Sequence, residues 1–360
     1  MKRVKNLYQK IYDFETLLFA YNKSGKGRRF SEEVLAYTAN FEENLIDTQN
    51  HLIHKTYEIG RYRQFFVHDP KKRLIMSLPF RDRVVQWAVY HVLNPVFSKG
   101  YIYDSYGCIE EKGSQQAVKR LKYWLNKIGR HKKVYFLKLD ISKYFFRVDH
   151  AILLDILGRK IADPDTMWLL EKIIKSEDTG FGLPVGFSAH ETDERLFDKG
   201  MPIGNLTSQM FANIYLNEID QYCKREMRIR HYIRYMDDIV ILSDSKEMLH
   251  QYKETISVYL DEKLRLSLNK KTCVRPATLG IDFLGYKVWA THIKLRKSSA
   301  RKMKRRLKGI QKQYARGEID FAKANATVQS YLGIMKHCDS LRLKKKIFGE
   351  FVLRRNEHEQ

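Results

Sequence analysis

The sequence of 360 residues has few cysteines and no long apolar run. Its four cysteines lie far apart and form no C-x-x-C pair: Cys108, Cys223, Cys273 and Cys338. This spacing indicates neither a zinc site nor a disulfide framework, and it fits a reducing cytosol. A membrane-spanning helix needs about 18 or more consecutive apolar residues, and the sequence has neither such a run nor a lipidation signal. We therefore expect a cytoplasmic protein without a membrane partner.

Acidic residues are also scarce relative to basic ones. The chain carries 66 Lys and Arg against 42 Asp and Glu, which gives a net charge of +24. Such an excess predicts a polyanionic partner, most simply nucleic acid, because Lys and Arg bind by neutralising phosphates. An anionic membrane surface is the competing explanation. The 44% hydrophobic content is that of a globular protein, and the length allows two or three domains.

Paired carboxylates stand at the most informative position of the chain. Asp237–Asp238 separates two short β-prone runs, 231–233 and 239–242, which predicts a hairpin with the carboxylates at its tip. Taken alone, the pair is more often part of an ordinary turn. A second apolar run, 134–139, also ends in a carboxylate, Asp140. Three carboxylates at the ends of neighbouring strands suit two Mg²⁺ ions, which clamp the oxygens of a phosphoryl transfer. This pattern predicts a polymerase palm.

Periodicity places the other elements around these carboxylates. We expect strands at 61–67, 71–79, 134–140, 264–268 and 283–289. We expect helices within 1–60 and at 82–93, 115–127 and 248–263, and a long polar loop over 176–200. From Lys294 onward basic residues follow one another almost without acids. A charge run is usually a solvated face, but next to a polymerase palm it predicts a helical thumb that grips a duplex backbone.

An ordered series of motifs makes the prediction specific. It consists of Ser105-Tyr-Gly107, Leu139-Asp140 followed by aromatic residues, Gly200-Met-Pro-Ile-Gly204 followed by Ser208, Tyr235-Met-Asp-Asp238 and Phe283-Leu-Gly-Tyr286. In this order, over about residues 60 to 290, the series resembles a reverse transcriptase. Within that superfamily, which includes group II intron and retron enzymes, residues 202–209 and 330–337 resemble the reverse transcriptases of diversity-generating retroelements.

The resemblance implies an α+β right-hand polymerase. Residues 1–60 would form an N-terminal helical extension, 61–290 the fingers and a palm with an antiparallel sheet, and 291–360 a basic helical thumb. It implies an RNA-directed DNA polymerase, encoded by a bacterium or phage, that copies template RNA and introduces errors at adenines. The alternatives are a retron-type or phage-defence reverse transcriptase without a mutagenic role, and an inactive RNA-binding module.

The same resemblance assigns the candidate catalytic residues. Asp140 and Asp237 would bridge two Mg²⁺ ions, for which Mn²⁺ is a possible substitute, with the main-chain carbonyl of Ile141 as a further ligand. Asp238 would complete the charge cluster. Phe145, five residues after Asp140, would be the aromatic gate against a ribose 2′-hydroxyl, with a core phenylalanine as the alternative.

Nucleotide and nucleic-acid contacts follow in the same way. Arg73 and Lys112 would contact the incoming triphosphate, while the further nucleotide-binding candidates are Ile203, Gly204 and Gln209. The primer grip would consist of Phe283, Leu284, Gly285 and Tyr286. The template–primer backbone would meet Arg301, Lys304, Arg305 and Lys308. The implied partners are template RNA, the RNA/DNA hybrid, dNTPs and a small basic accessory protein.

Overall fold

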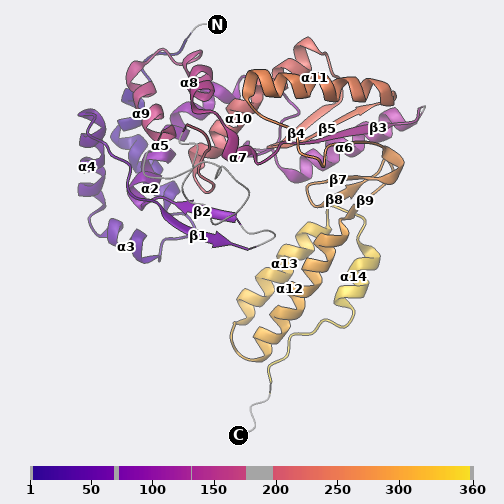
Figure 1. Ribbon diagram of the computed structural model, residues 1–360. Helices are drawn as coiled ribbons and strands as arrows, with labels where there is room; N and C mark the ends of the chain where they lie inside the picture. Colours follow the sequence, from indigo (N-terminus) through magenta and orange to yellow (C-terminus); the bar gives the residue numbers. More distant parts are fainter. Residues whose placement is uncertain (1–2, 69–72, 131, 176–197, 357–360) are drawn as a thin grey trace, which may run out of the picture. The chain divides into compact units, whose positions relative to one another are not determined.

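The computed structural model describes residues 3–68, 73–130, 132–175 and 198–356 (Figure 1). The chain forms two compact units, between which it passes several times. Unit 1 consists of Met1–Ile109, Asp140–Arg230 and Glu254–Lys271. Unit 2 consists of Glu110–Leu139, His231–Lys253 and Thr272–Gln360.

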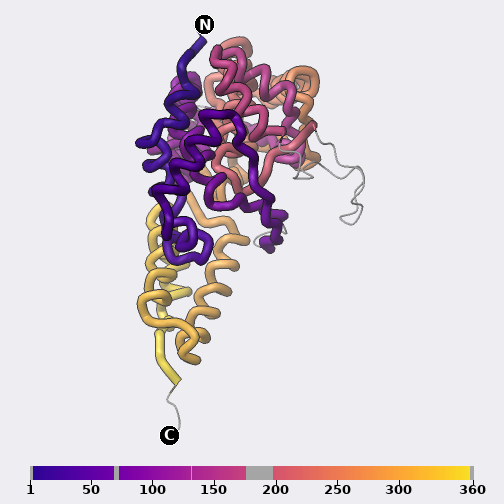
Figure 2. Tube along the Cα trace, turned by 90° about the vertical axis from the view of Figure 1, so that its left-hand side faces the viewer, coloured from indigo at the N-terminus to yellow at the C-terminus, as the bar shows by residue number. Residues whose placement is uncertain are grey.

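Unit 1 begins with short helices that pack on one long helix. These are α1 (Tyr8–Tyr12), α2 (Phe14–Ser24), α3 (Glu32–Ala39) and α4 (Phe41–Ile53), and all four contact α5 (Phe80–Ser98). Figure 2 shows them as the indigo part of the tube. The contact face of α5 includes Val84, Ala88 and Leu93, which are fully buried. The helix expected at 82–93 is therefore confirmed. It extends beyond the predicted range at both ends, from Phe80 to Ser98.

The remaining helices of unit 1 show how side-chain caps set their starts. They are α7 (Tyr144–Arg147), α8 (His150–Gly158), α9 (Pro164–Ile174), α10 (Leu206–Gln221) and most of α11 (Lys246–Leu264). Asp149 caps α8 by accepting from the amide of Ile152. Asp163 caps α9, with Pro164 in the first turn, where its missing amide hydrogen costs nothing. The unit also holds the antiparallel hairpin β1 (Arg63–Val67) and β2 (Arg73–Ser77), as expected.

Unit 2 contains two sheets, except that Asp140, the last residue of β3, belongs to unit 1. The first has the order β4-β5-β3-β6, formed by β3 (Tyr135–Asp140), β4 (Tyr232–Tyr235), β5 (Asp238–Ser243) and β6 (Cys273–Pro276). The second consists of β7 (Ile281–Phe283), β8 (Tyr286–Val288) and β9 (Ile293–Leu295), all paired antiparallel. Helix α6 (Ser114–Gly129) packs on β4 and β8. Helices and largely antiparallel strands give the α+β class that the sequence predicts.

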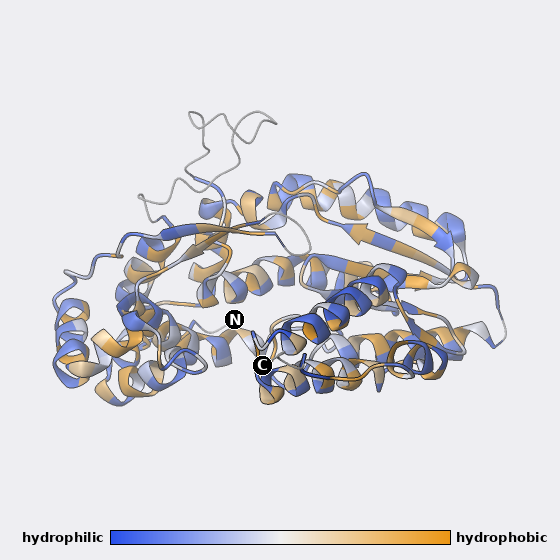
Figure 3. Cartoon of the chain, turned by 90° about the horizontal axis from the view of Figure 1, so that it is seen from below, coloured by the Kyte–Doolittle hydropathy of each residue, from blue (hydrophilic) through white to orange (hydrophobic). Residues whose placement is uncertain are grey.

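Three helices complete unit 2 as a bundle. They are α12 (Lys297–Ala315), α13 (Phe321–Met335) and α14 (Leu341–Phe348), drawn in yellow shades in Figure 1. Met303 and Leu307 of α12 and Met335 of α13 form its buried centre. Figure 3 shows hydrophilic and hydrophobic segments alternating along the helices, as expected when one face is buried and the other is solvated.

Two predicted strands are wrong. The single strand expected at 283–289 is interrupted by a turn at Leu284 and Gly285, which joins the antiparallel strands β7 and β8. Residues 264–268 form no strand, because α11 continues to Leu264 and only Leu268 makes an isolated bridge, with Ile141. An alternating pattern over five residues was too short to distinguish a strand from a helix end followed by an extended turn. The predicted loop at 176–200 lies mostly outside the described residues. Among the helices in the described ranges, none has the length and apolarity needed to cross a membrane.

Candidate active site

The carboxylate pair lies at a tight hairpin of unit 2. Strands β4 and β5 pair antiparallel with Tyr235 opposite Asp238, so Met236 and Asp237 form a two-residue loop. Met236 has φ 53°, a left-handed conformation that costs a non-glycine residue roughly 1–3 kcal/mol. Such strain persists only where the surroundings impose it. The turn therefore places Asp237 at the tip and Asp238 at the first position of β5.

A buried arginine holds this turn. Arg234 is 0% exposed, and its Nη1 donates to the carbonyl oxygen of Met236 at 3.2 Å. A guanidinium is always charged, so its burial costs much free energy unless its N–H groups donate hydrogen bonds. We infer that Arg234 positions the loop that carries Asp237. This role was not predicted from the sequence, although an arginine three residues before Asp237 in an otherwise apolar strand was a visible signal.

The third carboxylate ends a strand next to this hairpin. In the sheet order β4-β5-β3-β6, β3 neighbours β5, and its last residue is Asp140. Two residues earlier on β3, the Nζ of Lys138 donates to Oδ2 of Asp238 at 3.2 Å and to the carbonyl of Asp282 at 2.6 Å. Lys138 thus supplies a cation to the carboxylate cluster, which sequence reasoning did not anticipate.

The donor set fits a divalent metal ion in its chemistry. Carboxylate oxygens are the ligands that Mg²⁺ prefers, and Asp140, Asp237 and Asp238 lie at the ends or in the loop of adjacent strands of one sheet. Within the described ranges, no group of three His, Cys, Asp or Glu side chains is arranged to hold an ion. Metal binding by these residues stays a prediction.

The segment after Asp140 belongs to unit 1. It contains both a core residue, Tyr144, and the candidate gate residue, Phe145. Tyr144 is 2% exposed and donates its hydroxyl to the carbonyl of Ala212 at 2.7 Å, so it is a core residue. Phe145 is half-buried, lies edge-on to the ring of Tyr144, and accepts at its carbonyl from the amide of Met201. The proposed metal ligand Ile141 is buried beside Leu268. The side chain of Phe145 is therefore less buried than a core ring, and its gating role stays a prediction.

In unit 1 the loop before α10 lies against strand β2. The amide of Met76 donates to the carbonyl of Ile203 at 3.1 Å. Gly204 has φ +124°, and a Cβ there would lie 3.0 Å from the carbonyl oxygen of Met76, so only glycine fits. The structure thus joins Ile203 and Gly204 to the strand that starts with Arg73. Gln209 is exposed on α10.

Lys112 precedes α6 and belongs to unit 2, whereas Arg73 belongs to unit 1. Each lies in a segment expected to meet the triphosphate, and their joint action stays a prediction.

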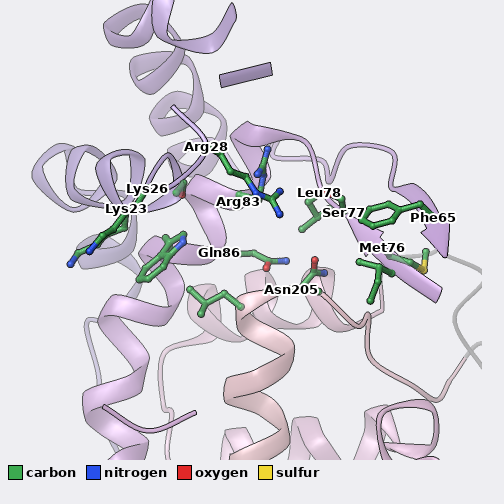
Figure 4. A pocket seen from close by; sticks show the side chains of 15 residues that line it. Lys23, Lys26, Arg28, Phe65, Met76, Ser77, Leu78, Arg83, Gln86 and Asn205 are labelled. Atoms are coloured by element: carbon green, nitrogen blue, oxygen red, sulfur yellow. The ribbon is translucent and has the colours of Figure 1, made fainter. Parts of the chain in front are cut away.

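A cationic pocket of about 330 Å³ lies within unit 1 beside Gly204 (Figure 4). Figure 4 shows arginines on one side and two amide side chains on the other. The basic and aromatic lining residues are Lys23, Lys26, Arg28, Arg83, Phe65 and Trp87, and the amides are Gln86 and Asn205. Cations with aromatic rings are the combination that binds single-stranded nucleic acid, through phosphates and stacked bases.

Two contacts give this pocket a fixed frame. Arg83 pairs with Glu33 across 2.5 Å, and Asn205 donates to the hydroxyl of Tyr62 at 2.9 Å. Burial raises the pKa of Tyr62, so its hydroxyl stays neutral. Lys26 and Arg28 of the basic segment 24–29 lie on the pocket wall. The dense positive charge of this segment is the sequence signal that could have indicated the pocket.

The candidate primer grip forms a turn attached to the start of α12. Leu284 and Gly285 have φ 50° and 84° and connect β7 to β8. The carbonyl of Gly285 accepts from the amide of Arg296 at 2.9 Å and from the hydroxyl of Ser299 at 3.1 Å. The turn is therefore fixed to the first turn of α12. Phe283 and Tyr286 flank it and are buried.

Helix α12 presents the predicted basic residues opposite its core. Met303, Leu307 and Ile310 are buried. Arg301, Arg305 and Lys308 are exposed, and Lys304 is half-buried. Helical geometry puts residues 301, 305 and 308 on one face, away from the buried one. The arrangement leaves these cations available to a polyanion.

The comparisons with known proteins identify the family of the chain. Residues 67–288 match the family model of reverse transcriptase (RNA-dependent DNA polymerase). This match covers more than half of the chain, so the protein belongs to the reverse transcriptase family. The expected fold is thereby confirmed, and members of the family generally use divalent metal ions.

The chain is similar to several bacterial proteins over part of their length. Protein YkfC of Escherichia coli (strain K12) is 28% identical over 241 residues, which are 58% of this chain and 61% of that protein. Group II intron-encoded protein LtrA of Lactococcus lactis subsp. cremoris is 24% identical over 320 residues, 71% of this chain and 51% of that protein. A solved structure of apo telomerase from Candida tropicalis, truncated from the C-terminal domain, has a TM-score of 0.46 at 14% identity and covers 66% of this chain and 55% of that one. The chain thus spans between half and two thirds of the length of these curated relatives.

Proposed function

We propose that this protein copies a retroelement template RNA into cDNA by two-metal nucleotidyl transfer, with errors at template adenines that diversify a target gene. The observation that carries the polymerase proposal is the two-residue loop with Asp237, on a strand pair adjacent to the strand that ends at Asp140. In the reaction, the 3′-hydroxyl oxygen of the primer bonds to the α-phosphorus of a dNTP. The bond to the bridging oxygen breaks, and pyrophosphate leaves.

Asp140, Asp237 and Asp238 would hold the divalent ions, which when bound neutralise charge on the attacking and leaving oxygens. The rest of the chemistry is positioning, the main contribution of proteins to phosphoryl transfer. Arg234 holds the loop of Asp237, and Lys138 holds Asp238. The turn at Gly285, fixed to α12, would hold the primer end.

The pocket of unit 1 supports RNA as the template. Its cations and rings lie beside Gly204, at the loop proposed to meet the incoming nucleotide. A single strand could place phosphates on Arg28 and Lys26 while a base stacks on Phe65 or Trp87. The uncopied template would then lie within reach of the loop with Ile203 and Gly204 in unit 1.

The mutagenic role rests on the residues 202–209, where isoleucine occupies the position of a glutamine in intron and retron enzymes. Ile203 offers no hydrogen-bond donor or acceptor in its side chain, so only its shape can select a base pair. The bias toward adenine comes from the family resemblance.

The test is primer extension on poly(rA)/oligo(dT) with Mg²⁺, using the wild type and Asp237→Asn. A neutral amide binds Mg²⁺ poorly, so the variant should lose DNA synthesis while it retains its fold and binding of the template–primer. Extension by the variant at a rate close to wild type would overturn the metal assignment. Inactivity of both proteins, with binding retained, would support the alternative of an RNA-binding module. Sequencing of the cDNA from a mixed RNA template then tests the adenine errors separately.

A further inference from the structure

Helix α6 has a buried apolar face and an uncovered basic one. Its inner residues are buried, and the helix packs on β4 and β8: Ala117, Val118, Leu121, Trp124 and Leu125. Its outer residues are exposed: Lys119, Tyr123, Asn126, Lys127 and Arg130. The helix is therefore anchored to unit 2 through one side and leaves the other side free for a partner.

The stretch around this helix contains no acid. Between Lys112 and Lys133 the sequence has eight Lys and Arg and no Asp or Glu. In the part of the chain that the structure describes, four cations of the helix and its end form no ion pair with an acid: Lys119, Lys122, Lys127 and Arg130. Lys132, beyond the helix, pairs with Asp244. A charge left uncompensated in this way attracts a polyanion.

The outer residues follow one line along the helix. Lys119, Tyr123, Lys127 and Arg130 are three or four residues apart, so they share a face. From the first to the last the rise is about 16 Å, at ~1.5 Å per residue. That length matches several consecutive phosphates on a nucleic-acid strand, at roughly 3.4 Å per base step.

The chemistry of this line favours RNA over an acidic protein. Protein interfaces have an apolar centre, and lysine is depleted in them. The outer face of α6 offers a single aromatic ring, Tyr123, which is 54% exposed, among lysines and an arginine. The guanidinium of Arg120 lies 5.9 Å from that ring. Lysine point charges suit phosphates, and an exposed ring suits a ribose or an unpaired base.

We propose that the outer face of α6 binds the phosphate backbone of a folded segment of the template RNA, outside the stretch being copied. The inference rests on the proposed function, since it assumes that RNA is the template. It adds a second RNA contact that does not belong to the candidate active site or to the thumb helix α12. Such a contact would hold a particular RNA on the enzyme independently of its primer end.

The experiment compares two substrates that differ only in a folded segment. One is an RNA hairpin whose single-stranded 3′ tail is annealed to a DNA primer, and the other is the same tail and primer without the hairpin. The variant is Lys119→Gln, Lys127→Gln and Arg130→Gln together. A matched control removes three exposed lysines elsewhere, with Lys99→Gln, Lys246→Gln and Lys263→Gln.

We expect the α6 variant to lose about tenfold in affinity for the hairpin substrate at 0.15 M salt and to show a log–log salt slope that is smaller by roughly two to three. Its affinity for the hairpin-free substrate, and its rate of primer extension there, should equal those of the wild type. The control should bind both substrates like the wild type.

Equal binding of the hairpin substrate by the wild type and the α6 variant would overturn the proposal and leave α6 a solvated face or a site for an acidic protein. An equal loss on both substrates would also overturn it, because α6 would then contact the template–primer itself. A failure of the proposed function has a different signature, since the wild type would then extend neither primer.

Discussion

The ammonium group of Lys138 bridges the candidate catalytic hairpin and the second sheet of unit 2. It donates to Asp238 on β5 at 3.2 Å and to the carbonyl of Asp282 on β7 at 2.6 Å. Both Lys138 and Asp238 are about three-quarters buried, with exposures of 25% and 26%, so their attraction is only partly screened by solvent. One cation therefore orients Asp238 and also lowers the negative charge that a metal ion would meet.

Replacement of Lys138 by methionine should separate these two effects. Loss of the positive charge should tighten divalent-ion binding by about tenfold, since charges a few ångströms apart interact by one or more kcal/mol even after screening. Loss of the tether should at the same time lower kcat for primer extension. Mn²⁺ binding to the protein alone, followed by electron paramagnetic resonance, checks the first effect and needs no activity. Lys138→Arg keeps the charge and is the control. Unchanged Mn²⁺ affinity in Lys138→Met would leave this lysine with a purely structural role.

A second prediction concerns stability in acid. The carboxylate of Asp163 accepts from the amides of Leu7 and Tyr8 at 2.9 and 2.8 Å and caps α9. Burial alone would raise its pKa, but these amides and the hydroxyl of Thr166 outweigh burial and lower the pKa below its usual value. The folded state therefore favours the ionised form. Its contribution to stability is complete above the unfolded pKa of about 3.9 and is lost as the pH falls through the lower folded pKa.

Asp163→Asn should therefore lower the free energy of unfolding by about 1 kcal/mol at pH 7, with a smaller difference from the wild type at pH 3. Urea unfolding at both pH values measures this. Asp13→Asn is a matched control, because Asp13 caps α2 through the single amide of Thr16. The same loss at pH 3 as at pH 7 would show that the charge of Asp163 is not what stabilises the N-terminal segment.

The sequence predicted what short-range patterns encode. The Met236–Asp237 loop followed from two β-prone runs around paired carboxylates, and the buried stripe of α5 from its period. Lys138 and Arg234 did not follow, since their roles depend on which strands become neighbours and on how deeply a side chain is buried. An arginine within the apolar strand could be seen in the sequence, but its complete burial and its contact with Met236 depend on the whole fold.

The pocket beside Gly204 shows the same limit at a larger scale. Its lining comes from α2, the hairpin, α5 and the loop before α10, segments that are far apart in the sequence. Only the basic cluster at 24–29 gave a local hint. The strand expected at 264–268 was wrong although a local pattern was present. The residues alternate between apolar and polar, but α11 continues to Leu264 and the segment after it forms no strand.

Phe145→Ala should let the enzyme incorporate ribonucleotides. If the ring excludes the 2′-hydroxyl by its bulk, its removal should lower the preference for dNTPs over rNTPs by at least about tenfold, equivalent to ~1.4 kcal/mol of lost discrimination. The ratio of kcat/KM for dCTP and CTP measures it. Phe146→Ala, at the neighbouring half-buried phenylalanine, is the control. A preference that stays the same in Phe145→Ala would place the gate elsewhere.

The last prediction concerns Ile203 and fidelity. The backbone of this residue is held by the amide of Met76, which donates to its carbonyl at 3.1 Å, and Gly204 behind it is too close to β2 for any side chain. A change of side chain at 203 should therefore alter the chemistry at the nucleotide without moving the loop. Isoleucine is β-branched and apolar, so it contributes shape alone. A glutamine there could hydrogen-bond, which is worth about 0.5–1.5 kcal/mol.

Since ~1.4 kcal/mol is a factor of ten in rate, Ile203→Gln should lower misincorporation opposite template adenine by severalfold while polymerase activity is retained. Ile203→Leu, which remains apolar, should keep the error frequency of the wild type. The measurement is sequencing of cDNA made by all three enzymes on one RNA template. The hydrogen bond by itself gives no reason for adenine to differ from other bases, so error frequencies at all four template bases are compared. A fall at every base would make Ile203 a general determinant of fidelity, with the adenine bias arising elsewhere. Equal frequencies in the wild type and Ile203→Gln would make this isoleucine a packing residue.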